Sequence, residues 1–307
     1  MTRRSFIQVV AFSPFALRLE AREADAHTVE IRDLLMGTFV QVKGVGVKKE
    51  ALTDAISHMR GLERVLSRFD EASPLSELNR KGSLKSPHGE LMNVLHLARE
   101  AYAETVGAFD VTVLPVLLHF EAHGKALTQK EHERFRTVVG FDKVDVGSRD
   151  VSLKRTGMQL TLDGIATGYI IDRGVARLRE SGCASVLVNV GGDIYCGTSQ
   201  KGWDVGIYNP LRDAVVRKVR PDDAAVCTSG NYVNYYSKNK RLHHIIDPKS
   251  LVSPTDVVSV TAVARTTVRA DILSTALFVV GEKGRGFLKD GEKAYLIARD
   301  GSEKILS

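Results

Sequence analysis

The fold of this chain is decided by two distant stretches, Leu162-Asp163-Gly164-Ile165-Ala166-Thr167-Gly168-Tyr169 and Ala270-Asp271-Ile272-Leu273-Ser274-Thr275. Asp271 and Thr275 lie four residues apart, so on a helix they share one face. A carboxylate, a hydroxyl and a backbone carbonyl, for which Ala166 in the first stretch is a candidate, are the oxygen ligands that Mg2+ prefers. The spacing alone also fits a simpler interpretation, in which Asp271 caps the start of a helix and Thr275 packs inside it.

The order of the predicted elements indicates the fold class. Apolar residues at helical spacing predict helices over 49–66, 91–106, 172–181 and 271–280, while 67–79 is expected to be a loop and 115–141 has no clear pattern. Strands are expected around 31–43, with an interruption at 36–38, and over 185–190, 203–208, 224–228, 256–264 and 294–298. Because helices and strands do not alternate strictly, the sequence predicts an α+β protein with mixed or antiparallel sheets and packed helices.

Composition narrows the possible partners. The 307 residues are 43% hydrophobic, enough for a full core, and we find neither a repeat nor an interdomain linker. The 43 basic and 37 acidic residues are spread without a long single-sign run, which favours a solvated surface over a nucleic-acid interface. Since no apolar stretch reaches about 18 residues, the protein is expected to be peripheral to a membrane at most.

The first 26 residues resemble an export signal. Two arginines, Arg3 and Arg4, precede a mostly apolar run over 9–17, and Ala24-Asp25-Ala26 has the small residues of a cleavage site. We therefore expect residues 1–26 to be a twin-arginine signal peptide and 27–307 to be one periplasmic domain. The three cysteines, Cys183, Cys196 and Cys227, fit no zinc spacing and are expected to be small buried residues.

Three further segments combine turn residues with reactive groups. Gly191, Gly192 and Asp193 follow a predicted strand, where the glycines either bring backbone amides close to a phosphate or only form a tight turn. The segments Thr228-Ser229-Gly230-Asn231-Tyr232 and His243-His244-Ile245-Ile246-Asp247-Pro248 could place a general base beside a reacting hydroxyl. The alternative for each is structural, with His244 hydrogen-bonded inside the fold and Asp247-Pro248 a simple turn.

Taken in order, these segments resemble the ApbE family of FAD:protein FMN transferases. The matching segments are 36–38, 67–79, 109–115, 162–172, 189–193, 228–232, 244–248, 260–261 and 270–281. The resemblance therefore extends over nearly the whole chain after the signal peptide. It implies an ApbE-like, T-fold-like single large domain.

The resemblance also implies an activity and a set of site residues. FAD would be the donor substrate, Mg2+ would bind at its pyrophosphate, and FMN would pass to a threonine hydroxyl of an acceptor flavoprotein with release of AMP. The acceptor would be a redox-complex subunit or a flavin reductase. The metal ligands would be Ala166, Asp271 and Thr275, and His244 would accept the proton of the acceptor threonine. The remaining candidates would bind FAD: Met36, Phe69, Asn79, Asp110, Asp163, Gly191, Gly192, Asp193, Thr228, Ser229 and Gly230.

Four positions depart from the family pattern. Thr167 stands where the family usually has lysine, and Asp163 stands where it usually has a small residue. Phe69 replaces a frequent tyrosine, and Pro74 replaces a common acidic residue. The changes leave two other hypotheses open: an Mg2+-dependent FAD pyrophosphatase that passes FMN to water, and a non-catalytic FAD-binding or flavin-delivery protein.

Overall fold

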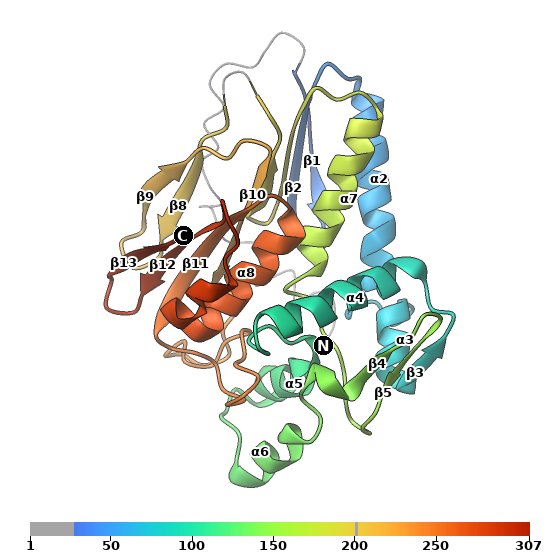
Figure 1. Ribbon diagram of the computed structural model, residues 1–307, viewed down its shortest axis with the longest axis vertical. Helices are drawn as coiled ribbons and strands as arrows, with labels where there is room; N and C mark the ends of the chain where they lie inside the picture. Colours follow the sequence, from blue (N-terminus) through green and yellow to red (C-terminus); the bar gives the residue numbers. More distant parts are fainter. Residues whose placement is uncertain (1–27, 200–201) are drawn as a thin grey trace.

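An eight-stranded antiparallel sheet forms the frame of the protein (Figure 1). The computed structural model describes residues 28–199 and 202–307. The strands follow one another across the sheet in the order β1 (Thr28–Leu35), β2 (Thr38–Val45), β6 (Ser185–Val190), β7 (Asp193–Cys196), β10 (Ala224–Gly230), β11 (Val257–Ala264), β12 (Lys293–Ala298) and β13 (Glu303–Leu306). Every neighbouring pair is antiparallel, so the sheet is not of the parallel α/β type.

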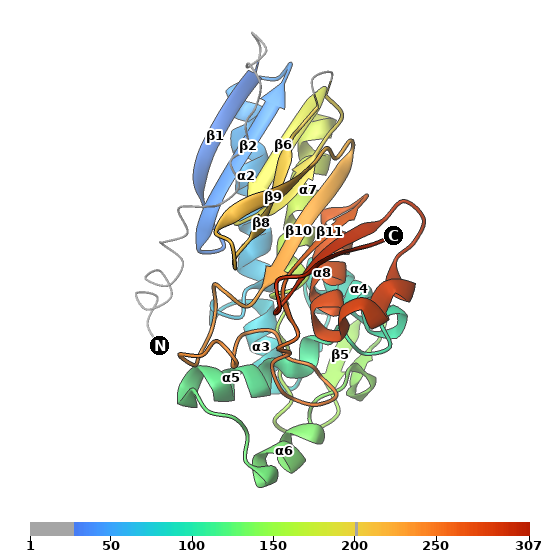
Figure 2. The ribbon, with the colours of Figure 1, turned by 90° about the vertical axis from the view of Figure 1, so that its left-hand side faces the viewer.

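Three helices cover one face of this sheet: α2 (Lys49–Leu66), α7 (Ala166–Glu180) and α8 (Thr267–Val280) (Figure 1). A two-stranded ribbon, β8 (Val205–Asn209) and β9 (Ala214–Val219), lies on the opposite face (Figure 2). There Trp203 and Val205 pack against Leu187, Ile194 and Val226 of the main sheet. Both faces in the middle of the sheet are therefore buried, which explains its nearly continuous apolar strands.

The remaining elements gather at one end of the sheet (Figure 2). They are α3 (Pro74–Lys81), α4 (Gly89–Glu104), α5 (Leu114–His123), α6 (Gln129–Arg136), and a small sheet of β3 (Ser83–Lys85), β5 (Asp150–Leu153) and β4 (Val144–Val146). The described residues also form three short 3-10 helices: η1 (Val111–Val113), η2 (Phe141–Lys143) and η3 (Gly281–Phe287). One hydrophobic core runs from β2 and α2 into α4 and α5, so both parts share a single interior.

The predicted α+β class is confirmed, but several elements were missed. The segment 67–79 is not all loop, because Ser73 caps a helix whose first residue is Pro74. The stretch 115–141, which had no clear pattern, forms most of α5 and α6, and a Thr128–Glu131 capping box starts α6. Strands β9 and β13 were missed because both carry exposed charged side chains among their apolar ones.

The two helices of the deciding stretches both begin earlier than predicted. Helix α7 starts at Ala166 and not at residue 172, and α8 starts at Thr267 and not at residue 271. The side chain of Thr266 caps α8 by accepting a hydrogen bond from the Arg269 amide. Asp271 therefore lies in the second turn, and the helix-cap interpretation of Asp271 is excluded.

The expected signal peptide, residues 1–26, lies outside the described residues. In the part of the chain that the structure describes, no helix is both long and apolar enough to cross a bilayer. Cys183, Cys196 and Cys227 are buried, as predicted, and all three are free thiols, which the sequence had left open.

Helices α7 and α8 cross so closely that only glycine fits at residue 168. A Cβ atom there would lie 2.6 Å from the carbonyl oxygen of Thr267 and 2.6 Å from the Cα of Val268, both backbone atoms. We therefore predict that Gly168→Ala lowers the free energy of unfolding by about 1–3 kcal/mol, measured by urea denaturation. Gly61→Ala in α2 is the matched control, since nothing lies within 4 Å of that position. It should stabilise the helix by about 1 kcal/mol, and equal effects of the two substitutions would contradict the close crossing.

Candidate active site

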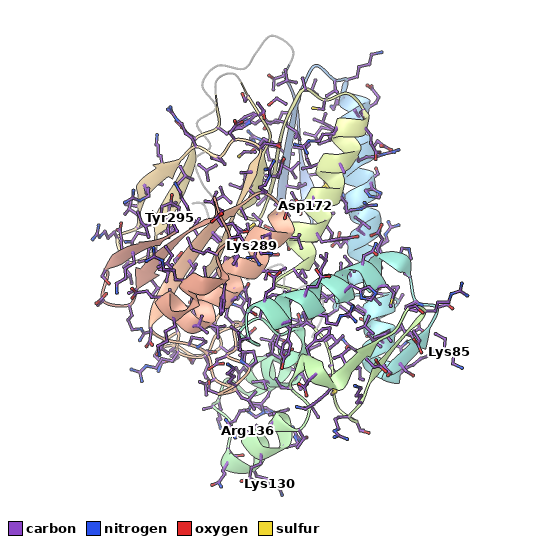
Figure 3. The ribbon with its side chains drawn as sticks, in the orientation of Figure 1. Lys85, Lys130, Arg136, Asp172, Lys289 and Tyr295 are labelled. Atoms are coloured by element: carbon purple, nitrogen blue, oxygen red, sulfur yellow. The ribbon has the colours of Figure 1, made fainter. Side chains whose placement is uncertain are left out.

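The two deciding stretches meet where α7 and α8 cross. The amide of Gly168 donates to Oδ2 of Asp271 over 3.2 Å. One turn further along α7, Asp172 accepts hydrogen bonds from the amides of Thr267 (2.8 Å) and Val268 (2.9 Å), and it lies between the two helices in Figure 3. The carboxylate of Asp172 thus satisfies the free amides at the start of α8. The first turns of both helices are held in one fixed arrangement.

Asp271 and Thr275 share a face of α8, as the spacing predicted. Asp271 is 5% exposed, and Oγ1 of Thr275 lies 3.3 Å from the hydroxyl of Ser229 in β10. A Cβ atom on Gly164 would lie 3.1 Å from the same Oγ1, so the turn before α7 passes close to Thr275. The structure therefore gathers a carboxylate, two hydroxyls and the backbone of a glycine turn in one place.

Two backbone carbonyls, those of Ala166 and Gly164, are candidates for the metal ligand from this turn. Ala166, the candidate from the sequence, is the first residue of α7, where a carbonyl accepts the amide four residues further on. Gly164 precedes the helix, and a Cβ atom built on it would meet Oγ1 of Thr275. Both residues lie in the stretch that approaches Asp271 and Thr275.

The site has an excess of buried negative charge. Burial raises the pKa of Asp271 well above its ordinary value, and neighbouring Asp193 raises it further. Burial likewise raises the pKa of Asp193 to about 6. Burial also raises the pKa of the Cys227 thiol, and the nearby carboxyls of Asp193 and Asp271 raise it further. Within residues 28–199 and 202–307, no basic side chain forms an ion pair with Asp271 or Asp193. The same residues contain no cluster of three or more His, Cys, Asp or Glu side chains suited to a metal.

The Gly191-Gly192 turn is a tight hairpin between β6 and β7. Gly191 has φ 61° and Gly192 has φ 108°, and Val190 pairs with Asp193 across the turn. The Gly191 amide donates to the carbonyl of Phe39, and the Gly192 amide donates to the side chain of Asn189. Both amides already have acceptors, so the turn interpretation accounts for the glycines, and only Asp193 turns a functional group toward the acidic site.

Met36 lies beside Thr167, the position where the family usually has lysine. Met36 and Gly37, both with positive φ, form the two-residue turn between β1 and β2. Oγ1 of Thr167 lies 4.0 Å from the sulfur of Met36. Met36, which was predicted to contact FAD, and Thr167 therefore lie at the same edge of the site.

The side chains of Asn79 and Asp110 form their described hydrogen bonds with other residues of the fold. The Asn79 amide group binds both the carbonyl (2.9 Å) and the amide (2.7 Å) of Leu160, which fixes the chain that enters the turn. Oδ1 of Asp110 accepts from the amide and hydroxyl of Thr112 at the start of η1. Burial raises the pKa of Asp110 to about 6, and its Oδ2 has no partner among the described residues.

The other predicted β10 residues line the strand next to α8. Besides binding Thr275, the Ser229 hydroxyl lies 2.8 Å from the hydroxyl of Ser274. The Thr228 hydroxyl lies 2.9 Å from that of Thr261 on β11, and Gly230 packs beneath the ring of Tyr232. Of these three residues, the structure places Ser229 directly at the Asp271–Thr275 cluster.

Phe69 and Asp163 are joined by a residue that sequence reasoning missed. The guanidinium of Arg68 lies 4.1 Å from the centre of the Phe69 ring, which is 53% exposed. Nε of Arg68 donates to Oδ2 of Asp163 over 2.8 Å, and a terminal nitrogen of Arg68 donates to Glu121 over 3.0 Å. Asp163, whose role the sequence left open, is thus an ion-pair partner of Arg68. No local spacing connects these three segments, so only the tertiary structure could reveal the contact.

Two adjacent histidines have different surroundings. His243 is 0% exposed; its Nε2 lies 2.8 Å from the Pro254 carbonyl, and its Nδ1 accepts from the amide of Ile245. Nδ1 of His244 lies 3.1 Å from the carbonyl of Asn234. Because a carbonyl only accepts, Nδ1 of His244 carries the proton and Nε2 is left as a free acceptor. Burial lowers the pKa of both rings, that of His243 to about 4.

Two hollows lie elsewhere on the described surface. One, of about 460 Å³, is lined by Pro115, His119, His123, Arg134 and Phe135, and the other, of about 380 Å³, lies between α2 and α7. Neither includes Asp271, Thr275 or His244. The candidate site is therefore defined by its chemistry and not by cavity size.

Fold and site together define an α+β protein with a buried, oxygen-rich acidic centre at a helix crossing and a separate neutral histidine. The model of the ApbE family matches residues 36–297, and this chain belongs to the ApbE family.

Named relatives support this assignment over most of the chain. The FAD:protein FMN transferase of Treponema pallidum is 31% identical over 299 residues, covering 84% of this chain and 80% of that protein. The FAD:protein FMN transferase of Vibrio cholerae is 29% identical over 287 residues, covering 87% and 86%. The crystal structure of the Pseudomonas stutzeri flavinyl transferase ApbE in its apo form superposes with a TM-score of 0.82 at 25% identity, covering 92% of this chain and 97% of that chain.

The histidine geometry predicts how the two rings titrate. In an NMR titration of the labelled protein, His243 should change protonation near pH 4 and His244 below the ordinary value of 6.5. At pH 7, His244 should be neutral with its proton on Nδ1, because the Asn234 carbonyl holds that proton. A His244 ring that is protonated at pH 7, or neutral with its proton on Nε2, would contradict this arrangement.

Proposed function

We propose that this protein is an FAD:protein FMN transferase, which moves FMN from FAD to a threonine hydroxyl of an acceptor flavoprotein and releases AMP. The proposal is supported by membership of the ApbE family and by the activity in the names of its relatives. The observation that carries it is the meeting of Asp271, Thr275 and the Gly164 turn at one helix crossing. That meeting supplies the charge and the oxygen atoms that phosphoryl transfer requires.

The residues at the crossing fit Mg2+. Asp271 is buried beside a second carboxyl without a described basic partner, so a cation would relieve an existing electrostatic cost. The available donors are one carboxylate, the Thr275 hydroxyl and a turn carbonyl, all hard oxygen atoms. A site this sparse leaves most coordination positions to water and substrate phosphate, which is how Mg2+ commonly binds. Bound there, Mg2+ would neutralise charge on the pyrophosphate of FAD.

We assign the backbone ligand to the turn that leads into α7, with Ala166 as the candidate from the sequence and Gly164 as the alternative. A Cβ atom built on Gly164 would meet Thr275, and Ala166 lies two residues before Gly168, whose amide binds Asp271. Asp271 and Thr275 keep the ligand roles that the sequence suggested. Asp193 would add negative charge to the same site without being required as a ligand.

His244 is the proposed general base. Its free Nε2 can accept the proton of the acceptor threonine while the threonine oxygen attacks the phosphorus atom of the FMN half of FAD. The new bond is between that oxygen and phosphorus, the bond that breaks is the one to the AMP phosphate, and AMP leaves. A lowered pKa keeps Nε2 unprotonated at neutral pH, which suits an acceptor of protons.

The flavin and nucleotide contacts follow from exposure and position. Exposed Phe69 offers a face on which the flavin ring could stack, and Met36 borders the same site beside Thr167. Ser229 offers a hydroxyl next to Thr275. We assign Asn79, Asp110, Gly191 and Gly192 to holding the site in shape, since their described hydrogen bonds are made within the fold.

We also propose that the protein works in the periplasm. The twin arginines and the Ala24-Asp25-Ala26 site support export of a folded domain, and an exported acceptor flavoprotein would be its partner. N-terminal sequencing of the protein from a periplasmic fraction should give His27 as the first residue. Full-length protein retained in the cytoplasm would contradict this location.

The function is tested by following the products of FAD. Purified protein is incubated with FAD, Mg2+ and a flavin-acceptor domain, and AMP, free FMN and protein-bound flavin are measured. We expect covalent flavin and AMP in equal amounts, dependent on the acceptor. His244→Ala should bind FAD but lose transfer by about 100-fold or more. Free FMN without an acceptor requirement would instead identify a pyrophosphatase, and intact bound FAD would identify a binding protein.

Metal binding is tested through stability, without reference to turnover. Because the pKa of Asp271 is raised on folding, its ionisation destabilises the folded protein increasingly as pH rises above its unfolded value of about 3.9. In EDTA at pH 8, Asp271→Asn should therefore melt at a higher temperature than the wild type. Mg2+ at 100 times its Kd should raise the wild-type Tm by about 5–10 °C and leave the variant unchanged.

Exposed Asp290 provides the matched control for that measurement. Asp290→Asn should respond to Mg2+ as the wild type does. A full Mg2+ response in Asp271→Asn would place the metal elsewhere.

A further inference from the structure

Arg68 connects two acidic side chains from separate parts of the fold. Its side chain is only 9% exposed, although it follows α2 directly in a short surface segment. Nε donates to Asp163, in the turn before α7, over 2.8 Å, and a terminal nitrogen donates to Glu121, on α5, over 3.0 Å. Coulombic attraction to both carboxylates raises the pKa of the guanidinium against the effect of burial, so Arg68 stays charged.

Glu121 extends this connection to the segment that carries His244. The carboxylate oxygen Oε1 of Glu121 that binds Arg68 also accepts the hydroxyl of Tyr236 over 3.3 Å. Tyr236 belongs to a small hairpin, in which its amide donates to the Leu242 carbonyl over 2.7 Å. At the base of this hairpin, the Asn234 carbonyl accepts both the amide and Nδ1 of His244.

A continuous path of hydrogen bonds thus runs from the glycine turn to the histidine. It passes from Asp163 through Arg68, Glu121 and Tyr236 to the hairpin of residues 234–244. Asp163 is adjacent to Gly164, where an added Cβ atom would meet Oγ1 of Thr275. One end of the path is therefore the turn of the proposed metal site, and the other end is the proposed general base.

We propose that Arg68 is a positioning residue that sets the distance and orientation of His244 relative to the Gly164 turn, acting through Glu121 and Tyr236. The proposal rests on the function proposed above, because that function makes one end of the path a metal site and the other end a general base. Arg68 itself needs no contact with FAD. We name the four residues Asp163, Arg68, Glu121 and Tyr236 the Arg68 clamp.

Arginine is required here for a geometric reason. The planar guanidinium presents several donors in a fixed fork, so one side chain can hold two carboxylates in a defined relation. Lysine carries the same charge as a single point and cannot fix both partners. Asp163 supplies one of the two carboxylates that this fork holds, and Glu121 supplies the other.

The electrostatic surroundings of His244 give a readout that is independent of catalysis. Asp163 and Glu121 raise the pKa of His244, whereas Arg68 lowers it. His243 is the other titratable group next to His244 on the same segment. Burial remains the largest cause of the lowered value. Removal of the Arg68 charge should therefore raise the pKa of His244.

Three variants separate the clamp from general stability. Arg68→Lys keeps the charge and removes the fork, and Tyr236→Phe removes only the hydroxyl that joins Glu121 to the hairpin. Tyr195→Phe is the matched control, because the Tyr195 hydroxyl likewise binds an acid, Asp223, and an arginine, Arg179, but lies outside the clamp. Arg68→Met is added for the NMR titration of His244.

The clamp variants should lower kcat and leave the KM for FAD nearly unchanged. Arg68→Lys should lower kcat for transfer to the acceptor by about 100-fold and Tyr236→Phe by about tenfold, because small misplacements of catalytic groups have effects of this size. The KM for FAD should stay within about twofold in both, and Tyr195→Phe should match the wild type. In Arg68→Met, the pKa of His244 measured by NMR should rise.

Two results would overturn the clamp. One is an unchanged kcat in both Arg68→Lys and Tyr236→Phe, and the other is a His244 resonance and pKa that do not move in any clamp variant. If Arg68→Lys fails to fold, Tyr236→Phe decides the question through the same measurements. If the wild type itself transfers no flavin, the proposed function fails, while the NMR comparison still supports or refutes the clamp.

Discussion

The hydrogen bond from the Gly168 amide to the carboxylate of Asp271 is the contact on which the rest of the site depends. It exists only because α7 and α8 cross at van der Waals distance, with glycine at the crossing and Asp172 binding the free amides of α8. The same crossing brings the Gly164 turn close to Thr275, and it sets α8 over β10, which supplies Ser229, beside α7 over β6 and β7. A backbone constraint thus determines where every oxygen atom of the site lies.

That arrangement leaves the carboxyls of buried Asp271 and half-buried Asp193 without basic partners among the described residues, which is costly in a protein interior. Asp271 and Asp193 meet around the Cys227 thiol, and burial raises the pKa of each. In contrast, Asp163 is paired with Arg68, and Asp172 is satisfied by helix amides. The fold therefore compensates some acids internally and leaves those at the crossing available to a cation.

The sequence predicted the fold class and the pairing of the two deciding stretches, but not how the site is supported. Asp271 and Thr275 could be found because helical spacing is local, and the glycine turn could be found from its composition. Arg68 and Glu121 could not, since their contact joins segments 53 residues apart in the chain through side chains alone. The same limit applies to Gly191 and Gly192, whose amides have acceptors that only the folded sheet reveals.

A crystal structure with FAD, and with Mn2+ in place of Mg2+ so that the metal is located by its anomalous scattering, tests the central claim most directly. The account predicts one metal bound by the carboxylate of Asp271, the hydroxyl of Thr275 and a carbonyl of the turn before α7, at about 2.1–2.3 Å given ligand distances of about 2.0–2.1 Å for Mg2+. The pyrophosphate of FAD should complete its coordination, with Nε2 of His244 facing the FMN phosphate. A metal bound away from Asp271, or FAD bound elsewhere on the protein, would contradict the account.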